Sequence, residues 1–372
     1  MSWDLPEALD DEQLRRPFDH YARYRLAAEV VMLTVGPQAR VLDLGGGPGS
    51  LQAFRPDADV TATDIAAPSK WHEQAPSLIL ADGAQLPFAA DAFDVVVSLD
   101  TLEHVPPASR TSFTNEAARV AARWALVVCP YNTPGVADAD IALREYVKNR
   151  FAADLPTIQI LNEHLDYGHP DLATTREQMA AAGPVATIPS GRLDRWLAGM
   201  LAFFHLLALG DDEPVEVMQR FINRNLYAAD LADPAYRHGL LVRTGTDDVH
   251  PDQVAAQLTA RAATDPWADA DLDLLRITLG ETLVASATNA NERADQAARA
   301  LVAAEAQLQR SVTAAEDSRD LAEKLQAAHQ ADLDALQALQ ASHDELAAFR
   351  DQVLGHPVMR VRRMAQRLLG RG

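Results

Sequence analysis

A glycine-rich turn that follows an acidic residue is the stretch of the chain whose residue types best suit ligand binding. In VLDLGGGPGS, positions 41–50, an apolar run carries Asp43 and is followed by four glycines. Glycines let bare backbone amides approach a ligand closely, and a helix that begins there adds its positive N-terminal end. Dinucleotide-binding turns have the spacing GxGxxG, but Ser50 stands where the third glycine belongs. The turn predicts a nucleotide-like ligand, with nucleotide redox chemistry as one alternative.

Further acidic residues end the next apolar runs. Asp64 ends VTATD, and Asp82 follows the run ILA. A carboxylate at the end of the second strand accepts hydrogen bonds from ribose hydroxyls, although a dehydrogenase would place one there too. Asp100 follows the run VVVSL within DAFDVVVSLDTLEHVPP, residues 91–107. We expect it to contact either the cofactor or the acceptor.

Histidines supply the candidates for acid–base chemistry. His104 closely follows the run that ends at Asp100, and an imidazole titrates near neutral pH. The alternative for His104 is a helix-capping or packing role. The segment NEHLDYGHP, residues 162–170, adds His164 and His169 in an expected loop, for acceptor binding, as an alternative base, or only for loop hydrogen bonding. A metal is a further alternative, but these residues show no familiar ligand spacing.

These motifs together resemble those of a known enzyme family. The spacing DxGxGxG, at Asp43, Gly45, Gly47 and Gly49, resembles the first motif of class I S-adenosylmethionine-dependent methyltransferases. The segment 91–107 is similar to the fourth-strand motif of the ubiquinone and menaquinone methyltransferase-like branch, called type 11. The resemblance covers about residues 20–245.

The resemblance implies S-adenosylmethionine as the cofactor and a role for each motif. In this family the glycine turn passes beside the amino-acid portion and ribose, and a carboxylate after the third strand meets the adenine amino group, with the next backbone amide reaching the ring. The implied cofactor-binding residues are Asp43, Gly45, Gly47, Gly49, Asp64, Ile65, Asp82, Gly83 and Asp100. The implied catalytic candidates are His104, His164 and His169, without a metal.

The elements that must position these residues follow from hydrophobic patterning. Short, continuously apolar runs that alternate with helical segments are typical of a parallel sheet covered on both faces. We expect strands at 41–44, 60–63, 78–81, 95–99, 126–129, 185–188 and 239–243. We expect helices at 18–35, 109–124, 174–182, 193–209 and 214–227, and a loop-rich region after Pro130. The fold class is therefore α/β, and the resemblance makes it a doubly wound, seven-stranded, Rossmann-like methyltransferase sheet.

Composition changes along the chain predict four segments. The methyltransferase domain spans 1–245, with a helical insertion at about 192–235, and a linker with short helices spans 246–280. Residues 281–355 have almost no glycine or proline and carry a heptad-like pattern, which predicts a coiled coil or a single long helix. Residues 356–372 form a basic amphipathic tail, which rests on anionic lipid or ends a helix whose dipole its arginines complement.

Charge and cysteine content limit the function classes. A net charge of −20 argues against extensive electrostatic binding to the phosphate backbone of nucleic acid. The single cysteine, Cys129, cannot form an internal disulfide, which fits a reducing cytoplasm. If the basic tail binds lipid, we expect the protein at the inner face of the membrane. The apolar block 196–209 is shorter than the roughly 18 residues that span a bilayer.

We expect a cytoplasmic methyltransferase that O-methylates a sugar of a cell-surface glycan or of its precursor. The order of methyltransferase, coiled coil and basic tail is similar to bacterial methyltransferases found with polysaccharide-assembly enzymes. The alternatives are a quinone or small natural-product methyltransferase, and a scaffold whose coiled coil recruits partners and whose methyltransferase domain only senses the cofactor. The coiled coil would also allow a homo-oligomer.

Overall fold

The structure is a computed structural model that describes residues 11–46, 49–66, 78–151, 156–209 and 212–264, with single positions at 334, 338 and 341. Its strands are β1 Arg40–Leu44, β2 Asp59–Asp64, β3 Leu78–Leu80, β4 Phe93–Leu99, β5 Ala121–Pro130, β6 Val185–Arg192 and β7 Ala235–Arg243. Its helices are α1 Asp11–Leu14, α2 Phe18–Thr34, α3 Ser50–Phe54, η1 Leu102–His104, η2 Pro107–Ser109, α5 Arg110–Val120, α6 Val136–Arg150, α7 Pro156–Tyr167, α8 Leu172–Ala180, α9 Leu193–Leu209, α10 Asp212–Asn225 and α11 Pro251–Thr264.

The strands form one seven-stranded sheet with the order β3-β2-β1-β4-β5-β7-β6, which confirms the seven predicted strands but not an all-parallel sheet. The sheet is mixed, because β7 runs antiparallel to both β5 and β6. Chain order reverses between β1 and β4, and ligands of open α/β sheets bind at such a switch point, outside the carboxyl ends of the strands. Asp43 of β1 pairs with Ala62 of β2 and Val97 of β4, so the acidic strand ends share this edge.

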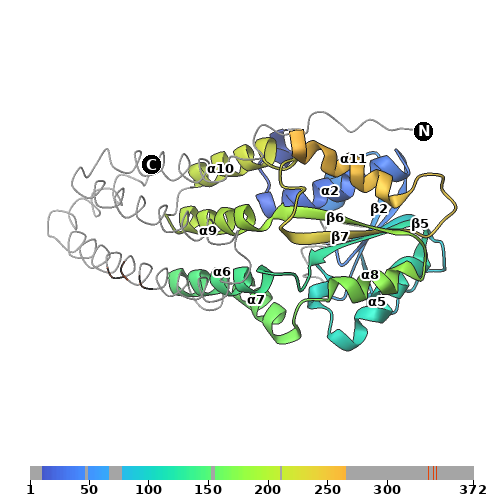
Figure 1. Cartoon of the computed structure of the whole chain (residues 1–372), viewed down its shortest axis with the longest axis horizontal. Coiled ribbons are helices and arrows are strands. Elements are labelled where there is room, and N and C mark those ends of the chain that lie inside the picture. The colour runs from blue at the N-terminus through green and yellow to red at the C-terminus, as the bar shows by residue number, and fades with distance from the viewer. Residues whose placement is uncertain are drawn as a thin grey trace, which may run out of the picture. The chain divides into compact units, whose positions relative to one another are not determined.

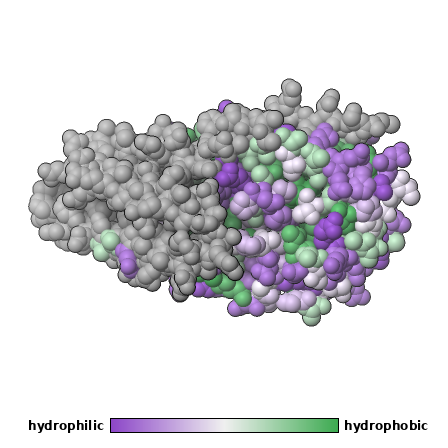
Figure 2. Space-filling view, viewed as in Figure 1, coloured by the Kyte–Doolittle hydropathy of each residue, from purple (hydrophilic) through white to green (hydrophobic). Residues whose placement is uncertain are grey.

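Helices cover both faces of the sheet, with α2 and α11 on one face and α5 and α8 on the other (Figure 1). Neighbouring residues of one strand point to opposite faces: Val41 packs in the cluster that contains α2, and Leu42 packs in the cluster that contains α5. A third apolar cluster joins α6, α7, α9 and α10. On the face shown in Figure 2, hydrophilic side chains are interspersed with smaller apolar areas.

Two predictions about the middle of the chain are wrong. The helix expected at 109–124 ends at Val120, because Ala121 already pairs with Phe93 of β4 and the pairing outweighs the helix preference of the local alanines. The region after Pro130 is helical rather than loop-rich, since α6 and α7 bury Val136, Leu143 and other apolar residues against α9. As a result the segment 162–167 lies in α7 and not in a loop.

Helix α11 packs on the sheet although it follows the last strand. Val254 and Leu258 are buried in the same cluster as Val41 of β1. Arg261 donates from Nη2 to Oε2 of the buried Glu29 of α2 at 2.5 Å. Helix α11, within the segment 246–280 that was predicted as a linker with short helices, therefore packs on the sheet.

Leu258→Ala tests this packing. Leu258 is fully buried, so removing its side chain leaves a cavity, and we expect the free energy of unfolding to fall by about 2–5 kcal/mol in urea denaturation. Gln257→Ala changes the exposed neighbouring residue and should shift stability by less than about 0.5 kcal/mol. If the two variants have the same stability, α11 is not part of the folded domain.

The remaining segments lie outside this description. Contacts divide the chain into the compact units Met1–Thr282 and Leu283–Gly372. The predicted coiled coil at 281–355, the basic tail at 356–372 and most of the predicted linker fall outside the described residues, so they stay predictions. Among the described residues, no helix is both long enough and apolar enough to cross a membrane.

Candidate active site

Asp43 and the glycine turn form a tight, incompletely satisfied cradle at the carboxyl end of β1. Asp43 is 1% exposed, and its Oδ1 has no hydrogen-bond partner among the described residues. A Cβ at Gly46 would lie 2.1 Å from Asp43 Cγ, and Gly45 has φ +76° with a Cβ position 2.3 Å from Thr101 Cγ2. Burial raises the pKa of Asp43 to about 7. The cradle therefore fits a ligand that brings hydrogen-bond donors and positive charge.

The other predicted cofactor residues lie along the same edge. Asp64 Oδ1 accepts from the backbone N–H of Ala66 at 3.0 Å, and Asp82 makes the same kind of turn with Ala84 at 2.9 Å, which leaves the other oxygen of each carboxylate for a ligand. Ile65 is 74% exposed, so it offers an apolar surface beside Asp64.

The glycines of the edge have different local surroundings. A Cβ at Gly83 would lie 2.5 Å from Phe113 Cε2, so packing against α5 explains why this position lacks a side chain. Gly49 caps α3 with φ 66°, and Gly47 lies outside the described residues. The predicted contacts of these glycines with a cofactor stay predictions.

Asp100 lies in a buried ion network that sequence reasoning missed. Arg237 of β7 donates from Nε to Asp100 Oδ1 and from Nη2 to Oδ2, both at 2.6 Å, and Arg23 Nη1 donates to Oδ2 at 2.8 Å. Both guanidiniums also reach Asp19 of α2, at 2.7 Å and 2.8 Å, and Trp196 Nε1 donates to Asp19 at 2.6 Å. Asp100 therefore joins α2 to β7 at the end of β4.

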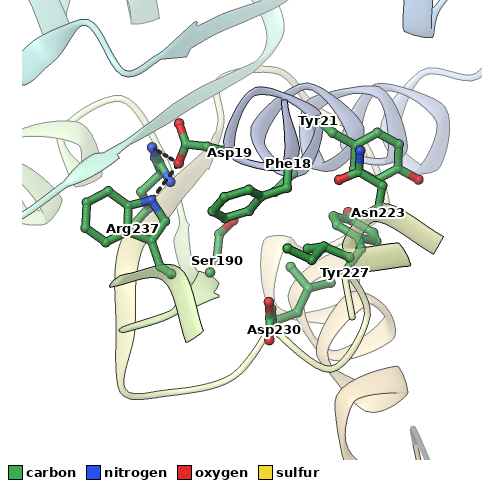
Figure 3. A pocket seen from close by; sticks show the side chains of 13 residues that line it. Phe18, Asp19, Tyr21, Ser190, Asn223, Tyr227, Asp230 and Arg237 are labelled. Carbon is green, nitrogen blue, oxygen red and sulfur yellow. Dashed lines mark hydrogen bonds and ion pairs between the residues drawn. The ribbon is translucent and has the colours of Figure 1, made fainter. Parts of the chain in front are cut away.

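A small cavity adjoins this network (Figure 3). Its walls include Phe18, Asp19, Trp196 and Arg237, and the figure shows Asp19 and Arg237 linked side by side. The volume of about 20 Å³ has room for roughly one water molecule. The cavity is therefore too small to hold an acceptor.

The structure brings two of the predicted histidines, His164 and His169, together at a residue that the sequence did not single out, Asp140 of α6. His164 Nδ1 lies 2.6 Å from Asp140 Oδ2, and His169 Nε2 lies 3.0 Å from the same oxygen. Tyr236 donates its hydroxyl to Asp140 Oδ1 at 2.6 Å. Burial alone would raise the pKa of Asp140, but these hydrogen bonds outweigh it and hold the pKa at about 2. Asp140 is therefore an anion that fixes two imidazoles.

His104 connects this buried cluster to the surface. Its Nδ1 lies 2.8 Å from Glu163 Oε2, and its Nε2 lies 3.4 Å from His164 Nε2. The side chain of His104 is 25% exposed, whereas that of His164 is 5% exposed. Burial and the neighbouring His164 lower the pKa of His104, so the imidazole is neutral at pH 7 and can accept a proton. Asp140, His164 and His104 thus form a line from the core to the surface.

The seven-stranded mixed sheet with helices on both faces fits a Rossmann-like methyltransferase fold. Residues 42–129 match the family model described as a methyltransferase domain. This segment is therefore a methyltransferase domain, and the cofactor that goes with it is S-adenosylmethionine. The buried Oδ1 of Asp43, which has no hydrogen-bond partner in the part of the chain that the structure describes, suits the positively charged amino-acid portion of that cofactor.

Curated relatives carry the same class of activity in their names. An uncharacterized methyltransferase of Mycolicibacterium vanbaalenii is 32% identical over 127 residues, which is 32% of this chain and 49% of that protein. A demethylmenaquinone methyltransferase of Mycobacterium marinum is 29% identical over 172 residues, 43% of this chain and 74% of that protein. The chain thus spans about half the length of the first of these relatives.

Solved structures of methyltransferases also match at low identity. The magnesium protoporphyrin IX methyltransferase of Synechocystis, solved with bound S-adenosylhomocysteine, is 19% identical with a TM-score of 0.33, over 50% of this chain and 82% of that one. The plantazolicin methyltransferase, in complex with the same compound, is 12% identical with a TM-score of 0.38, over 61% and 84%.

Asp43→Asn tests the cradle. Because Asp43 has a pKa of about 7 and the cofactor is cationic, the affinity for S-adenosylmethionine should increase as the pH rises through 7 and the carboxylate ionises. The variant should bind at least about tenfold more weakly at high pH and lose this pH dependence. Calorimetry at about pH 6 and pH 8 measures both.

Asp91→Asn, at an exposed position with φ 58° that asparagine tolerates, is the matched control. Equal affinities for Asp43→Asn and wild type would contradict the assignment.

Proposed function

We propose that this chain transfers the methyl group of S-adenosylmethionine to a hydroxyl oxygen of its acceptor and that the histidine cluster activates this hydroxyl. The observation that carries the proposal is the line from buried Asp140 through His164 to part-exposed His104. His104 follows the end of β4 by a few residues. The cluster therefore begins beside the edge that bears the cofactor cradle.

Each part of the edge has a separate task in this proposal. Asp43 and the glycine turn hold the amino-acid portion of the cofactor, and Asp64 and Asp82 hold its nucleoside. When bound, the cofactor supplies an activated methyl group on a sulfonium, so the protein has to orient a nucleophile and exclude water. His104 is neutral and part-exposed, which suits it to accept the hydroxyl proton, while Asp140 holds His164 behind it.

A sugar hydroxyl of a surface glycan or its precursor is our first candidate for the acceptor. A sugar hydroxyl is a weak acid, so its reaction needs help with proton removal, and the cluster offers that help. The predicted coiled coil and basic tail agree with an enzyme that works beside a glycan-assembly system.

A reduced quinone is the second candidate acceptor. The relative from Mycobacterium marinum, which the match covers over 74% of its length, is named a demethylmenaquinone methyltransferase. A phenolic acceptor would use the same base, because its hydroxyl also has to lose a proton before the ring becomes nucleophilic.

Transfer of a radiolabelled methyl group from S-adenosylmethionine separates these readings. The full-length protein is incubated with sugar nucleotides, with isolated glycans and with a reduced demethylated naphthoquinone, and products are identified by mass spectrometry and NMR. Our proposal predicts a methyl ether on a sugar. A methyl group on ring carbon would establish the quinone reading. Tight binding of S-adenosylhomocysteine without transfer to any acceptor would support a cofactor-sensing scaffold instead.

A further inference from the structure

His104 and His164 face each other through their Nε2 ring nitrogens. Each Nδ1 lies against a carboxylate, Glu163 at 2.8 Å for His104 and Asp140 at 2.6 Å for His164. Since a carboxylate accepts an N–H, both Nδ1 atoms are protonated in the neutral rings, and both Nε2 atoms present lone pairs. These two Nε2 atoms are 3.4 Å apart. Two lone pairs at this distance repel each other, and a cation between them, either a proton or a metal, would remove this repulsion.

The position of Glu103 indicates whether a proton or a metal ion lies between the two Nε2 atoms. Its side chain is 1% exposed, and Oε1 lies 4.0 Å from His104 Nε2. Its Oε2 is buried and has no hydrogen-bond partner among the described residues. A proton shared by the two imidazoles would leave this carboxyl group unsatisfied, at a considerable cost in a buried position. A metal ion near Oε1 would contact both nitrogens and place a positive charge beside this buried carboxylate.

We propose that Glu103, His104 and His164 bind one zinc ion. Their donor atoms lie within 4.8 Å of one another. Two nitrogens that each lie about 2.0–2.1 Å from a tetrahedral zinc ion are about 3.3–3.4 Å apart, and the observed separation is 3.4 Å. Glu103 Oε1 lies 4.0 Å from His104 Nε2, so this oxygen has to move closer to both nitrogens to complete the triangle.

The donor set and the outer contacts favour zinc over the hard cations. Magnesium and calcium prefer ligand sets made of oxygen, whereas two imidazoles and one carboxylate are a zinc set with an open fourth position. Histidines that bind zinc usually donate their other N–H to a carboxylate, which is what Asp140 and Glu163 accept here. The neighbouring group of Asp140, His164 and His169 is already joined by hydrogen bonds, so it supports the zinc site and is not a second one.

The role of this ion rests on the proposed function, although zinc binding itself does not. In the open position, zinc would hold the acceptor oxygen and lower the pKa of its hydroxyl. With zinc bound, Nε2 of His104 is a ligand and not a proton acceptor. Zinc would then replace direct proton acceptance by His104 as the means of activating the hydroxyl.

The test uses untagged full-length protein that is dialysed against a chelator and titrated with zinc chloride in a calorimeter. We expect one zinc ion per chain, and a cobalt-substituted form with the intense visible absorption of tetrahedral coordination. Glu103→Gln and His104→Ala should each weaken zinc binding by at least about 100-fold. Loss of a group that only hydrogen-bonds to a metal ligand costs up to about 100-fold in metal affinity, and loss of a ligand itself should cost at least as much. His250→Gln removes a half-exposed histidine at the start of α11 and should bind zinc like wild type. Thermal unfolding and calorimetry with S-adenosylhomocysteine establish that the variants are folded.

The possible results separate the zinc site from the proposed function. The zinc site is overturned if wild type binds no stoichiometric zinc or if both ligand variants bind it like wild type. Full methyl transfer by zinc-free protein would also overturn the role of zinc while leaving the proposed function intact. Stoichiometric zinc that depends on Glu103 and His104, in a protein that methylates no acceptor, would support the site and count against the proposed function.

Discussion

Asp140→Asn is expected to lower kcat by about 10³-fold while changing the affinity for S-adenosylhomocysteine by less than about twofold. Asp140 holds both His164 and His169 and receives the hydroxyl hydrogen bond of Tyr236. An amide in its place presents one oxygen and one N–H₂, so it cannot accept all three contacts and favours the wrong imidazole tautomer. Steady-state kinetics with the best acceptor measure kcat, and calorimetry measures the cofactor site.

Asp138→Asn is the matched control for this prediction, because it makes the same chemical change at an exposed position of the same helix. It should leave kcat within about twofold of wild type. If Asp140→Asn no longer binds zinc, the fall in kcat is explained by loss of the zinc ion. Retention of a third or more of the wild-type kcat by Asp140→Asn would mean that the histidine cluster has no part in the reaction.

Arg237→Met should lower the free energy of unfolding by about 3–5 kcal/mol, because it removes one of the two arginines that neutralise the buried carboxylates of Asp19 and Asp100. Arg237 is 4% exposed and binds both Asp100 and Asp19. Burial raises the pKa of Asp19, but Arg237 and Arg23 outweigh this and bring it to about 2, below its usual 3.8. The stabilisation from Asp19 is therefore complete above pH 3.8 and is lost as the pH falls toward 2.

Urea denaturation at neutral pH measures this loss, with Arg40→Met as the matched control. Arg40 pairs with Asp94 but its side chain is 52% exposed, so its replacement should cost less than about 1 kcal/mol. If the two arginine variants are equally stable, the buried network contributes little and does not hold α2 against β7.

The sequence predicted those features that depend on local pattern. Continuous apolar runs located all seven strands, because a strand covered on both faces contains few polar residues. The acidic residues Asp43 and Asp64 could be found for the same reason, since each stands at the end of such a run.

Features that depend on distant contacts were missed. Asp140 meets residues 24 and 96 positions away, and Arg237 meets Asp100 across 137 positions, with no motif around either one. The glutamate at 103 stood in a quoted motif, but its burial beside His164 of α7 could not be inferred until the helical nature of that region was known. The available signal for this glutamate was its position next to His104, shortly after the end of a predicted strand.

The most direct test of the account is a crystal structure of the full chain with S-adenosylhomocysteine. We predict that the nucleoside lies along Asp64 and Asp82, that the amino-acid portion reaches Asp43 and the glycine turn, and that the sulfur faces His104. An empty edge at saturating ligand, a nicotinamide dinucleotide bound there instead, or a sulfur that points away from the histidines would contradict it.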